Sequence, residues 1–111
     1  MIVYGLFLDD TPFYIGICNT TKKRTLQTRL YEHIYSATHP NKHQQLQRII
    51  SGCPTLKDQF ILASITDNIP LTIKELYSCD YECDSTEEDW IQHYKQQGFP
   101  ICNERTGLKL H

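Results

Sequence analysis

MIVYGLFLDDTPFYIGIC, residues 1–18, contains two runs of β-forming side chains. Residues 2–8 and residues 13–18 are rich in aliphatic and aromatic side chains, which favour strands. The sequence DDTP at residues 9–12 separates the two runs, and these residue types favour turns. The pattern predicts an antiparallel hairpin closed by this turn.

Two helices are predicted after the hairpin. Residues 22–37 carry apolar side chains at every third or fourth position, with candidate N-caps at Asn19, Thr20 and Thr21. His39 and Pro40 interrupt this periodicity, and residues 42–51 resume it until Gly52 stops the second helix. The hairpin is therefore expected to lead directly into a helical segment.

The second half of the chain adds a strand and a final helix. Residues 56–65 fit a helical face about as well as a buried strand, and we favour a helix. Residues 71–78 predict a strand, and residues 85–97 predict a helix that ends at Gly98. The candidate N-caps of this helix are Ser85 and Thr86. The expected fold class is α/β, of the α+β type: a small three-stranded antiparallel sheet flanked by helices.

Length and composition predict one domain covering residues 1–111. Hydrophobic residues make up 40% of the chain and charged residues 22%, close to the average of globular proteins. No apolar run approaches the roughly 20 residues of a membrane-spanning helix, and the N-terminus lacks the pattern of a secretory signal. We therefore expect a cytoplasmic protein with no membrane contact, and five cysteines that are mostly free thiols in the core.

The charge is distributed unevenly along the chain. The formal net charge is -2, yet residues 19–48 contain six Lys and Arg residues against the single acid Glu32, which gives +5. Seven acids and no Lys or Arg lie in residues 75–89. This asymmetry predicts a bipolar molecule with one basic face able to meet phosphate, although ordinary solvated charge on surface helices also explains the basic segment.

Several short motifs occur in a defined order along the chain. They are Ile2-Val3-Tyr4, Tyr14-Ile15-Gly16, Arg29 followed four residues later by His33, Leu46-Gln47-Arg48, Glu87 three residues before Trp90-Ile91, and Asn103. This order and spacing resemble the GIY-YIG nuclease family over roughly residues 2–103, with Ile2 where the family usually has glycine. Each motif alone is common, so the resemblance depends on their order.

The resemblance implies a metal-dependent endonuclease that hydrolyses DNA phosphodiester bonds by a one-metal mechanism. Glu87 would be the only protein ligand of Mg²⁺ or Mn²⁺. Arg29 would contact the scissile phosphate as a bidentate donor. Tyr4 would be the general base, and Tyr14 would bind the phosphate or orient the water. His33 would hold a tyrosine or contact phosphate.

Further residues are expected to support the site or the substrate. Asn103 would be a structural residue that ties the Glu87 helix to the sheet. The expected DNA contacts are Gly16, Lys22, Lys23, Arg24 and His39. The implied partner is duplex or branched DNA, and a homodimer or a partner protein would supply specificity. If a phage encodes the chain, the expected compartment is the host cytoplasm.

Two other classes of function remain open from the sequence. The net negative charge is unusual for a nuclease, and it favours a non-catalytic or partner-dependent adaptor that binds nucleic acid or protein on the same scaffold. Cys79 and Cys83, with a histidine such as His93, would instead suit a zinc-binding interaction module. For Tyr4 and Tyr14 the alternative to a catalytic role is a structural one, in which each ring packs as a strand residue. RNA remains an alternative to DNA as the substrate.

Overall fold

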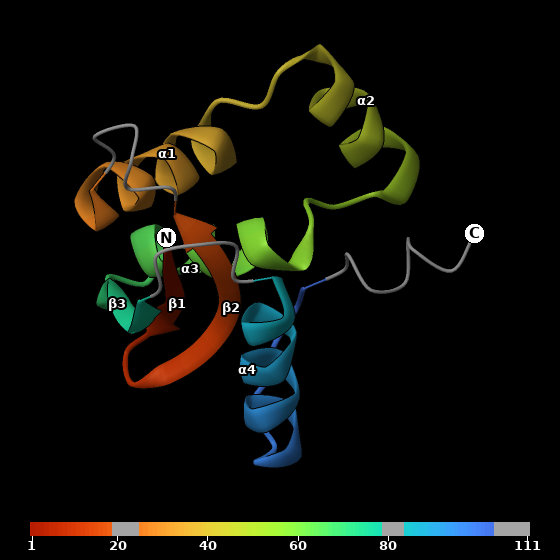
Figure 1. The fold of residues 1–111 in the computed structure, drawn as a ribbon. Coiled ribbons are helices and arrows are strands. Elements are labelled where there is room, and N and C mark those ends of the chain that lie inside the picture. The colour runs from red at the N-terminus through yellow and green to blue at the C-terminus, as the bar shows by residue number, and fades with distance from the viewer. Residues whose placement is uncertain (19–24, 79–83, 104–111) are drawn as a thin grey trace.

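The computed structural model describes residues 1–18, 25–78 and 84–103. Over these residues the chain forms three strands and four helices (Figure 1). The elements are β1 (Ile2–Leu8), β2 (Thr11–Cys18), α1 (Leu26–Thr38), α2 (Lys42–Ser51), α3 (Leu56–Thr66), β3 (Leu71–Ser78) and α4 (Asp84–Gln96). The predicted fold of a three-stranded antiparallel sheet flanked by helices is confirmed.

The sheet has the order β2-β1-β3, and both pairings are antiparallel. The central strand β1 is buried along residues 3–7, because it has a neighbour on each side. Tyr4 of β1 lies opposite Gly16 of β2 and opposite Glu75 of β3. The first and last strands of the order, β2 and β3, are the edges of the sheet.

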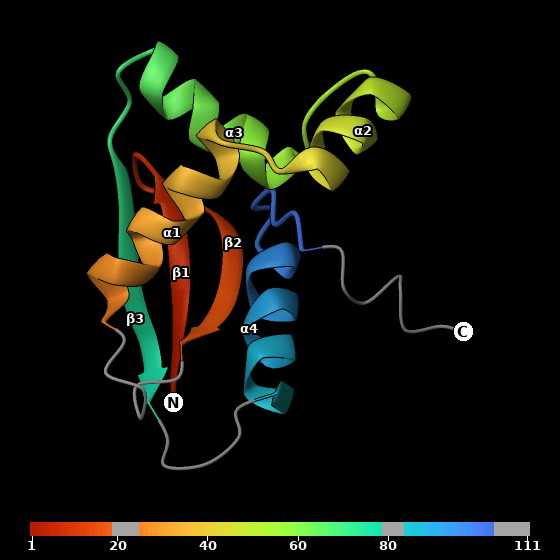
Figure 2. The ribbon, with the colours of Figure 1, turned by 90° about the horizontal axis from the view of Figure 1, so that it is seen from above.

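Helices cover both faces of the sheet, and each face has its own core cluster (Figure 2). On one face Tyr4 and Leu6 pack with Leu30 of α1 and Ile61 of α3. On the other face Val3 and Ile15 pack with Ile91 of α4, joined by partly buried Trp90 and Tyr94. Adjacent residues of a strand point to opposite faces, which explains why Val3 and Tyr4 belong to different clusters.

The N-caps of the predicted helices required correction. Thr25 caps α1 by accepting a hydrogen bond from the Thr28 backbone N–H at 3.1 Å, so this helix begins at Leu26 and not at residue 22. The expected caps of α1, Asn19, Thr20 and Thr21, lie outside the described residues. Helix α4 begins at Asp84, so the expected N-caps Ser85 and Thr86 lie within its first turn and not before it.

Other predicted boundaries agree with the structure. Helix α2 ends at Gly52, which has a φ of 80°, and Gly98 after α4 has a φ of 90°. The favoured helix at residues 56–65 is confirmed as α3.

The hairpin turn, in contrast, is shorter than expected. Strand β2 begins at Thr11, and Pro12 lies within the strand. An edge strand tolerates proline, since one side of its backbone needs no partner strand.

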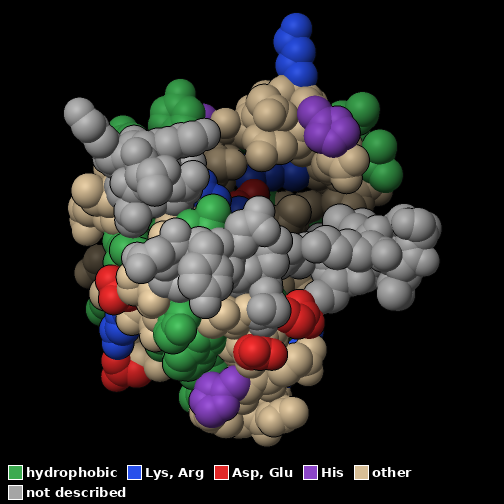
Figure 3. All heavy atoms as spheres, in the orientation of Figure 1, with side chains coloured by type: hydrophobic (Ala, Val, Ile, Leu, Met, Phe, Trp, Pro, Cys, Tyr) green, Lys and Arg blue, Asp and Glu red, His purple; other side chains and the backbone are tan. Residues whose placement is uncertain are grey.

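Helix α2 turns its apolar side chains outward. Leu46, Ile49 and Ile50 have exposed fractions of 54%, 77% and 75%. The polar side of the helix borders a cavity of about 730 Å³ shared with the start of α3, which Arg48 and Asp58 both line. In the space-filling view, basic and acidic side chains lie at the bottom of a hollow beside α2 (Figure 3). The amphipathic pattern of α2 is therefore reversed relative to a core-facing helix.

The three described cysteines differ in burial. Cys18 is buried and Cys102 is half-buried, as expected of core thiols, but Cys53 is exposed.

None of the helices in residues 1–18, 25–78 and 84–103 combines the length and the apolar character needed to cross a bilayer.

Candidate active site

Tyr4, Arg29 and His33 form a hydrogen-bonded cluster between β1 and α1. Arg29 Nε donates to the phenol oxygen of Tyr4 at 3.0 Å, and His33 Nε2 lies 2.7 Å from the same oxygen. Arg29 and His33 are four residues apart, which places both side chains on one helix face. Tyr4 is fully buried and His33 is only 4% exposed, so this network lies beneath the surface.

Gly16 makes room for the Tyr4 ring. The two residues are direct partners across β1 and β2, and a Cβ atom at Gly16 would collide with the phenol of Tyr4. Gly16 was expected to let substrate approach the backbone, but the Tyr4 side chain fills the space next to its Cα. The glycine is therefore explained by the packing of Tyr4, and its contact with DNA stays a prediction.

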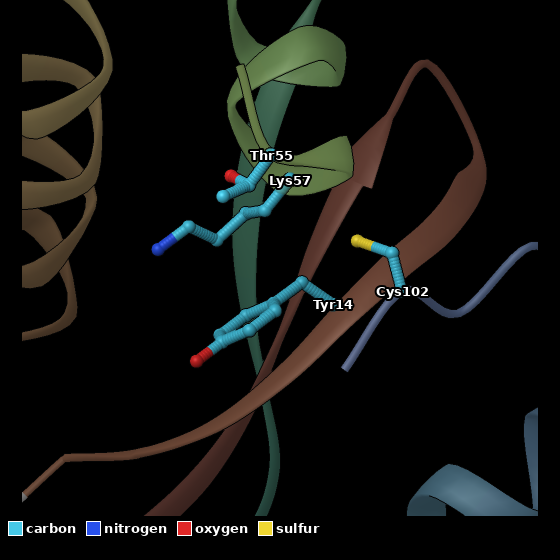
Figure 4. A pocket seen from close by; sticks show the side chains of 4 residues that line it. All are labelled: Tyr14, Thr55, Lys57 and Cys102. Carbon is cyan, nitrogen blue, oxygen red and sulfur yellow. The ribbon is translucent and has the colours of Figure 1, made fainter. Parts of the chain in front are cut away.

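Tyr14 and Lys57 extend the cluster toward a small cavity. The ring of Tyr14 lies edge-on to His33 with the centroids 5.4 Å apart. Lys57 Nζ lies 3.4 Å from His33 Nδ1 and 5.1 Å from the centroid of the Tyr14 ring. In the close view the Lys57 amine and the Tyr14 hydroxyl point to the same side of the cavity (Figure 4). The cavity has a volume of about 160 Å³, and Thr55 and Cys102 also line it.

Burial and neighbouring cations set the protonation states of this cluster. Burial raises the pKa of Tyr4, and the charge of Arg29 opposes this only in part, so the phenol is protonated at neutral pH. Burial, then the charges of Lys57 and Arg29, lower the pKa of His33 to about 3. His33 is therefore a neutral imidazole over the physiological pH range.

Arg29 also forms an ion pair with Glu32 of the same helix. Its Nη1 atom lies 3.0 Å from Glu32 Oε1, and the two side chains are 29% and 34% exposed. Arg29 thus connects the buried Tyr4 phenol to the solvent-accessible surface. Of the three hydrogen-bonded residues in this cluster, Arg29 is the one whose side chain can meet a phosphate from solution.

Glu87 approaches the sheet from the other face. It is only 6% exposed and lies four residues before Ile91, so both side chains project from the same face of α4. Ile91 packs on Val3 and Ile15, opposite to the face that carries Tyr4. Helices α1 and α4 therefore cover opposite faces of the sheet.

Glu87 offers a chemically suitable but single metal ligand. Within the described residues, no group of three or more His, Cys, Asp and Glu side chains lies close enough to hold a metal ion. If Glu87 is the one protein ligand, as the resemblance implies, water and phosphate oxygens would fill the other positions of the ion. Hard cations such as Mg²⁺ and Mn²⁺ accept such a ligand set.

Asn103 ties the C-terminal segment to the edge strand β2. Its Oδ1 atom accepts a hydrogen bond from the Ile15 backbone N–H at 3.0 Å, and its Nδ2 atom donates to the Ile15 carbonyl at 2.6 Å. The amide therefore satisfies the backbone of Ile15 as a further strand would. Asn103 is 8% exposed, and its side chain has a structural role, as the resemblance implies.

Two predicted residues lie away from the cluster, and five others lie outside the described residues. His39 follows α1, where its ring stacks on Tyr35 with the centroids 4.2 Å apart. It lies about 15 Å along the helix axis from Arg29, at about 1.5 Å for each residue. Lys22, Lys23, Arg24, Cys79 and Cys83 lie outside the described residues. His93 of α4 contacts Gln97, which directly follows the helix.

Sequence reasoning missed Lys57. Its one sequence signal is a lysine two residues after the capping Thr55, in the first turn of a helix, where the helix dipole disfavours positive charge. Its contact with His33 links residues 24 positions apart and depends on how α3 packs against α1.

No protein-family model, curated protein or solved structure matches this chain. The order of the sequence motifs and the geometry of the described side chains are therefore the two sources of information on function.

Proposed function

We propose that this chain is a metal-dependent endonuclease of the GIY-YIG type that hydrolyses DNA phosphodiester bonds by a one-metal mechanism. The observation that supports the proposal most strongly is the contact of Arg29 and His33 with the Tyr4 phenol oxygen. A buried tyrosine hydroxyl needs a hydrogen-bond partner, but a partly exposed guanidinium together with a buried imidazole exceeds that need. Perturbed pKa values in such a cluster are typical of functional sites.

Arg29 is the proposed phosphate ligand. Tyr4 and Glu32 each use one of its N–H groups, and a guanidinium has five, so donors remain for phosphate oxygens. A phosphodiester would compete with the Glu32 carboxylate for the guanidinium. Arginine suits this role because its planar donors match two phosphate oxygens at once.

Tyr4 is the proposed general base. The phenol would first lose its own proton to solvent water, and the resulting phenolate would accept a proton from the attacking water while the new bond to phosphorus forms and the leaving oxygen departs. The positive charge and hydrogen bond of Arg29 favour that phenolate, whereas burial disfavours it. Because Tyr4 is fully buried, we expect water to reach its oxygen when phosphate draws Arg29 away from Glu32.

Glu87 is the proposed metal ligand. A buried carboxylate is stabilised by a nearby cation, which agrees with its low exposed fraction of 6%. A bound divalent ion would stabilise negative charge on the leaving oxygen. Because Glu87 and Tyr4 approach the sheet from opposite faces, a substrate that contacts both would have to reach around the edge strand β2.

The burial of Tyr4 favours a second candidate function. A phenol with no exposed surface is also what a non-catalytic scaffold would retain, because its network with Arg29 and His33 then serves only folding. In that case the chain is an adaptor that binds nucleic acid or protein. The two candidates differ in whether the wild-type chain breaks a phosphodiester bond.

A cleavage assay tests the proposal. Labelled linear, supercoiled and branched DNA would be incubated with Mg²⁺ or Mn²⁺ and with the wild type, Tyr4→Phe, Arg29→Ala or Glu87→Gln. We expect the wild type to cut at least one substrate and the three variants to lose nearly all cutting. Glu88→Gln is the matched control, since it removes a neighbouring carboxylate of the same helix. Wild-type binding without cutting in either metal would support the adaptor.

A further inference from the structure

Lys57 contacts His33 and Tyr14, and the proposed mechanism gives it no role. Its ammonium lies 3.4 Å from His33 Nδ1 and 5.1 Å from the centroid of the Tyr14 ring. The residue belongs to α3, whereas His33 belongs to α1 and Tyr14 to β2. Lys57 therefore joins three elements at the point where the cluster borders the cavity (Figure 4).

The contact with Lys57 determines which nitrogen of His33 carries the proton. An ammonium has three donors and no acceptor, so His33 Nδ1 must be the acceptor of this hydrogen bond. A neutral imidazole that accepts at Nδ1 carries its hydrogen on Nε2. That hydrogen points at the Tyr4 phenol oxygen, 2.7 Å away.

The Tyr4 oxygen then accepts two hydrogen bonds. One comes from His33 Nε2–H and the other from Arg29 Nε–H at 3.0 Å. Because two donors occupy the lone pairs of the phenol oxygen, its own hydrogen has to point to a third direction. With the other tautomer of His33, Tyr4 would donate to Nε2, and the Nδ1–H would face the Lys57 ammonium donor to donor.

The location of Lys57 is unfavourable for its own helix. Thr55 is the N-cap of α3, so Lys57 lies in the first turn, where the positive end of the helix dipole repels a cation. The side chain is half-buried, and it lies between a neutral histidine and an aromatic ring. Helix stability does not explain a lysine at this position, whereas the polarisation of His33 does.

We propose that Lys57 is a positioning residue that fixes His33 as the Nε2–H tautomer and so presents two hydrogen-bond donors to the Tyr4 oxygen. A phenolate is stabilised by donors, so this arrangement prepares Tyr4 to lose and regain a proton. The tautomer is a property of the free protein. Only its effect on cleavage rests on the proposed nuclease function.

Nitrogen-15 NMR of the histidine side chains tests the tautomer without DNA or metal. In the wild type we expect His33 to show a protonated Nε2 and an unprotonated Nδ1, with His33→Gln assigning the signals. Lys57→Met removes the donor, so we expect a large population with the proton on Nδ1. Lys57→Arg restores a donor, and it should restore the Nε2–H form if its guanidinium reaches Nδ1.

Lys74→Met is the matched control. Lys74 also lies over an aromatic ring, with its Nζ 4.6 Å from the centroid of Phe7, but it belongs to β3 and makes no contact with His33. We expect this variant to leave the His33 signals unchanged. A wild-type His33 with its proton on Nδ1, or an unchanged tautomer in a folded Lys57→Met, overturns the proposal.

Cleavage kinetics then separate the two proposals. If the wild type cuts DNA, we expect Lys57→Met to lower kcat by roughly tenfold to a hundredfold, a range typical of residues that orient an active group. The KM should change little, because Lys57 acts through His33. If the wild type does not cut DNA, the proposed function fails, while the NMR result still decides the role of Lys57.

Discussion

Gly16 and Tyr4 are direct partners across β2 and β1, and the ring of Tyr4 fills the space that a side chain at residue 16 would occupy. The absence of one methyl group on β2 thus allows a large aromatic ring to lie over the neighbouring strand. From this place the phenol reaches Arg29 and His33 on α1. The glycine of one sequence motif therefore sets the position of the tyrosine of the other.

Gly16→Ala should destabilise the protein and displace Tyr4. The added Cβ collides with the phenol, and overpacking of this kind costs about 1–3 kcal/mol in a buried site. Urea unfolding measures the loss of stability. In a Tyr4→Leu background the same substitution should cost far less, because the ring is gone. Equal costs in the two backgrounds would contradict the proposed packing of the pair.

Asn103→Ala should weaken the attachment of the C-terminal segment. The substitution leaves the buried N–H and C=O of Ile15 without the amide, at about 1–3 kcal/mol for each group. Asn41→Ala is a matched control, since Asn41 caps α2 at an exposed position and its loss costs about 1 kcal/mol. A loss at Asn103 no greater than that at Asn41 would argue against its bridging role.

Local sequence signals predicted most of the fold because they act over a few residues. Gly52 and Gly98 end their helices with positive φ values, as expected of glycine after a helix. The third strand was predicted with its observed bounds, Leu71–Ser78. In each case the signal is a short pattern within the element or within two residues of its end.

Predictions were less accurate where several residues competed or where distant packing decided. The α1 segment offers several threonines that can cap a helix, and Thr25 does so because the apolar face begins at Leu26. The segment at residues 56–65 was ambiguous because its apolar side chains fit a helix about as well as a strand. The distinction depends on core packing, in which Ile61 lies beside Tyr4 and Leu30. No local pattern contains that information.

The candidate site shows the same division. The spacing of Arg29 and His33 predicts their common helix face, and both indeed contact Tyr4. The contact of Lys57 with His33 depends on the packing of α3 against α1, so the sequence could not reveal it. The side from which Glu87 approaches depends on which face of the sheet α4 covers, and this too is a tertiary property.

Arg48→Met should be more damaging than Asp58→Asn. Arg48 Nη2 lies 3.2 Å from Asp58 Oδ2 and donates to the Ala37 carbonyl, so it links α2 to α1 and α3. Removing it leaves the Asp58 carboxylate, which is 6% exposed, without its ion-pair partner, and in this partly buried pair the cost should stay below the roughly 3–5 kcal/mol of a fully buried one. Chemical denaturation compares the variants. A double variant that loses as much as the sum of the two would contradict the coupling.

Ile49→Ala should leave stability nearly unchanged despite the loss of a large apolar side chain. Ile49 is 77% exposed, and surface substitutions usually stay within about 0.5 kcal/mol. Ile61→Ala provides the contrast, because Ile61 is fully buried and such a truncation costs about 2–5 kcal/mol. Unfolding should be measured at two protein concentrations. A large, concentration-dependent loss for Ile49→Ala would mean that the apolar side of α2 is covered in solution.

His33 should make the folded state less stable at acidic pH. Its pKa is about 6.5 in the unfolded chain and about 3 in the folded protein, where burial and then the charges of Lys57 and Arg29 disfavour the imidazolium. Between these values the unfolded state binds a proton that the folded state does not. Stability attributable to His33 is therefore present above about pH 6.5 and falls as the pH drops toward 3, by at most about 1.4 kcal/mol for each pH unit.

The wild type and His33→Gln should be compared by urea unfolding at several pH values between about 4 and 7. Glutamine does not titrate, so the difference in unfolding free energy between the two proteins isolates the contribution of residue 33 from that of the other ionisable groups. We expect this difference to shift in favour of the variant as the pH falls. A difference independent of pH would mean that His33 binds its proton equally well in both states, which is incompatible with a neutral imidazole held between Lys57 and Tyr4.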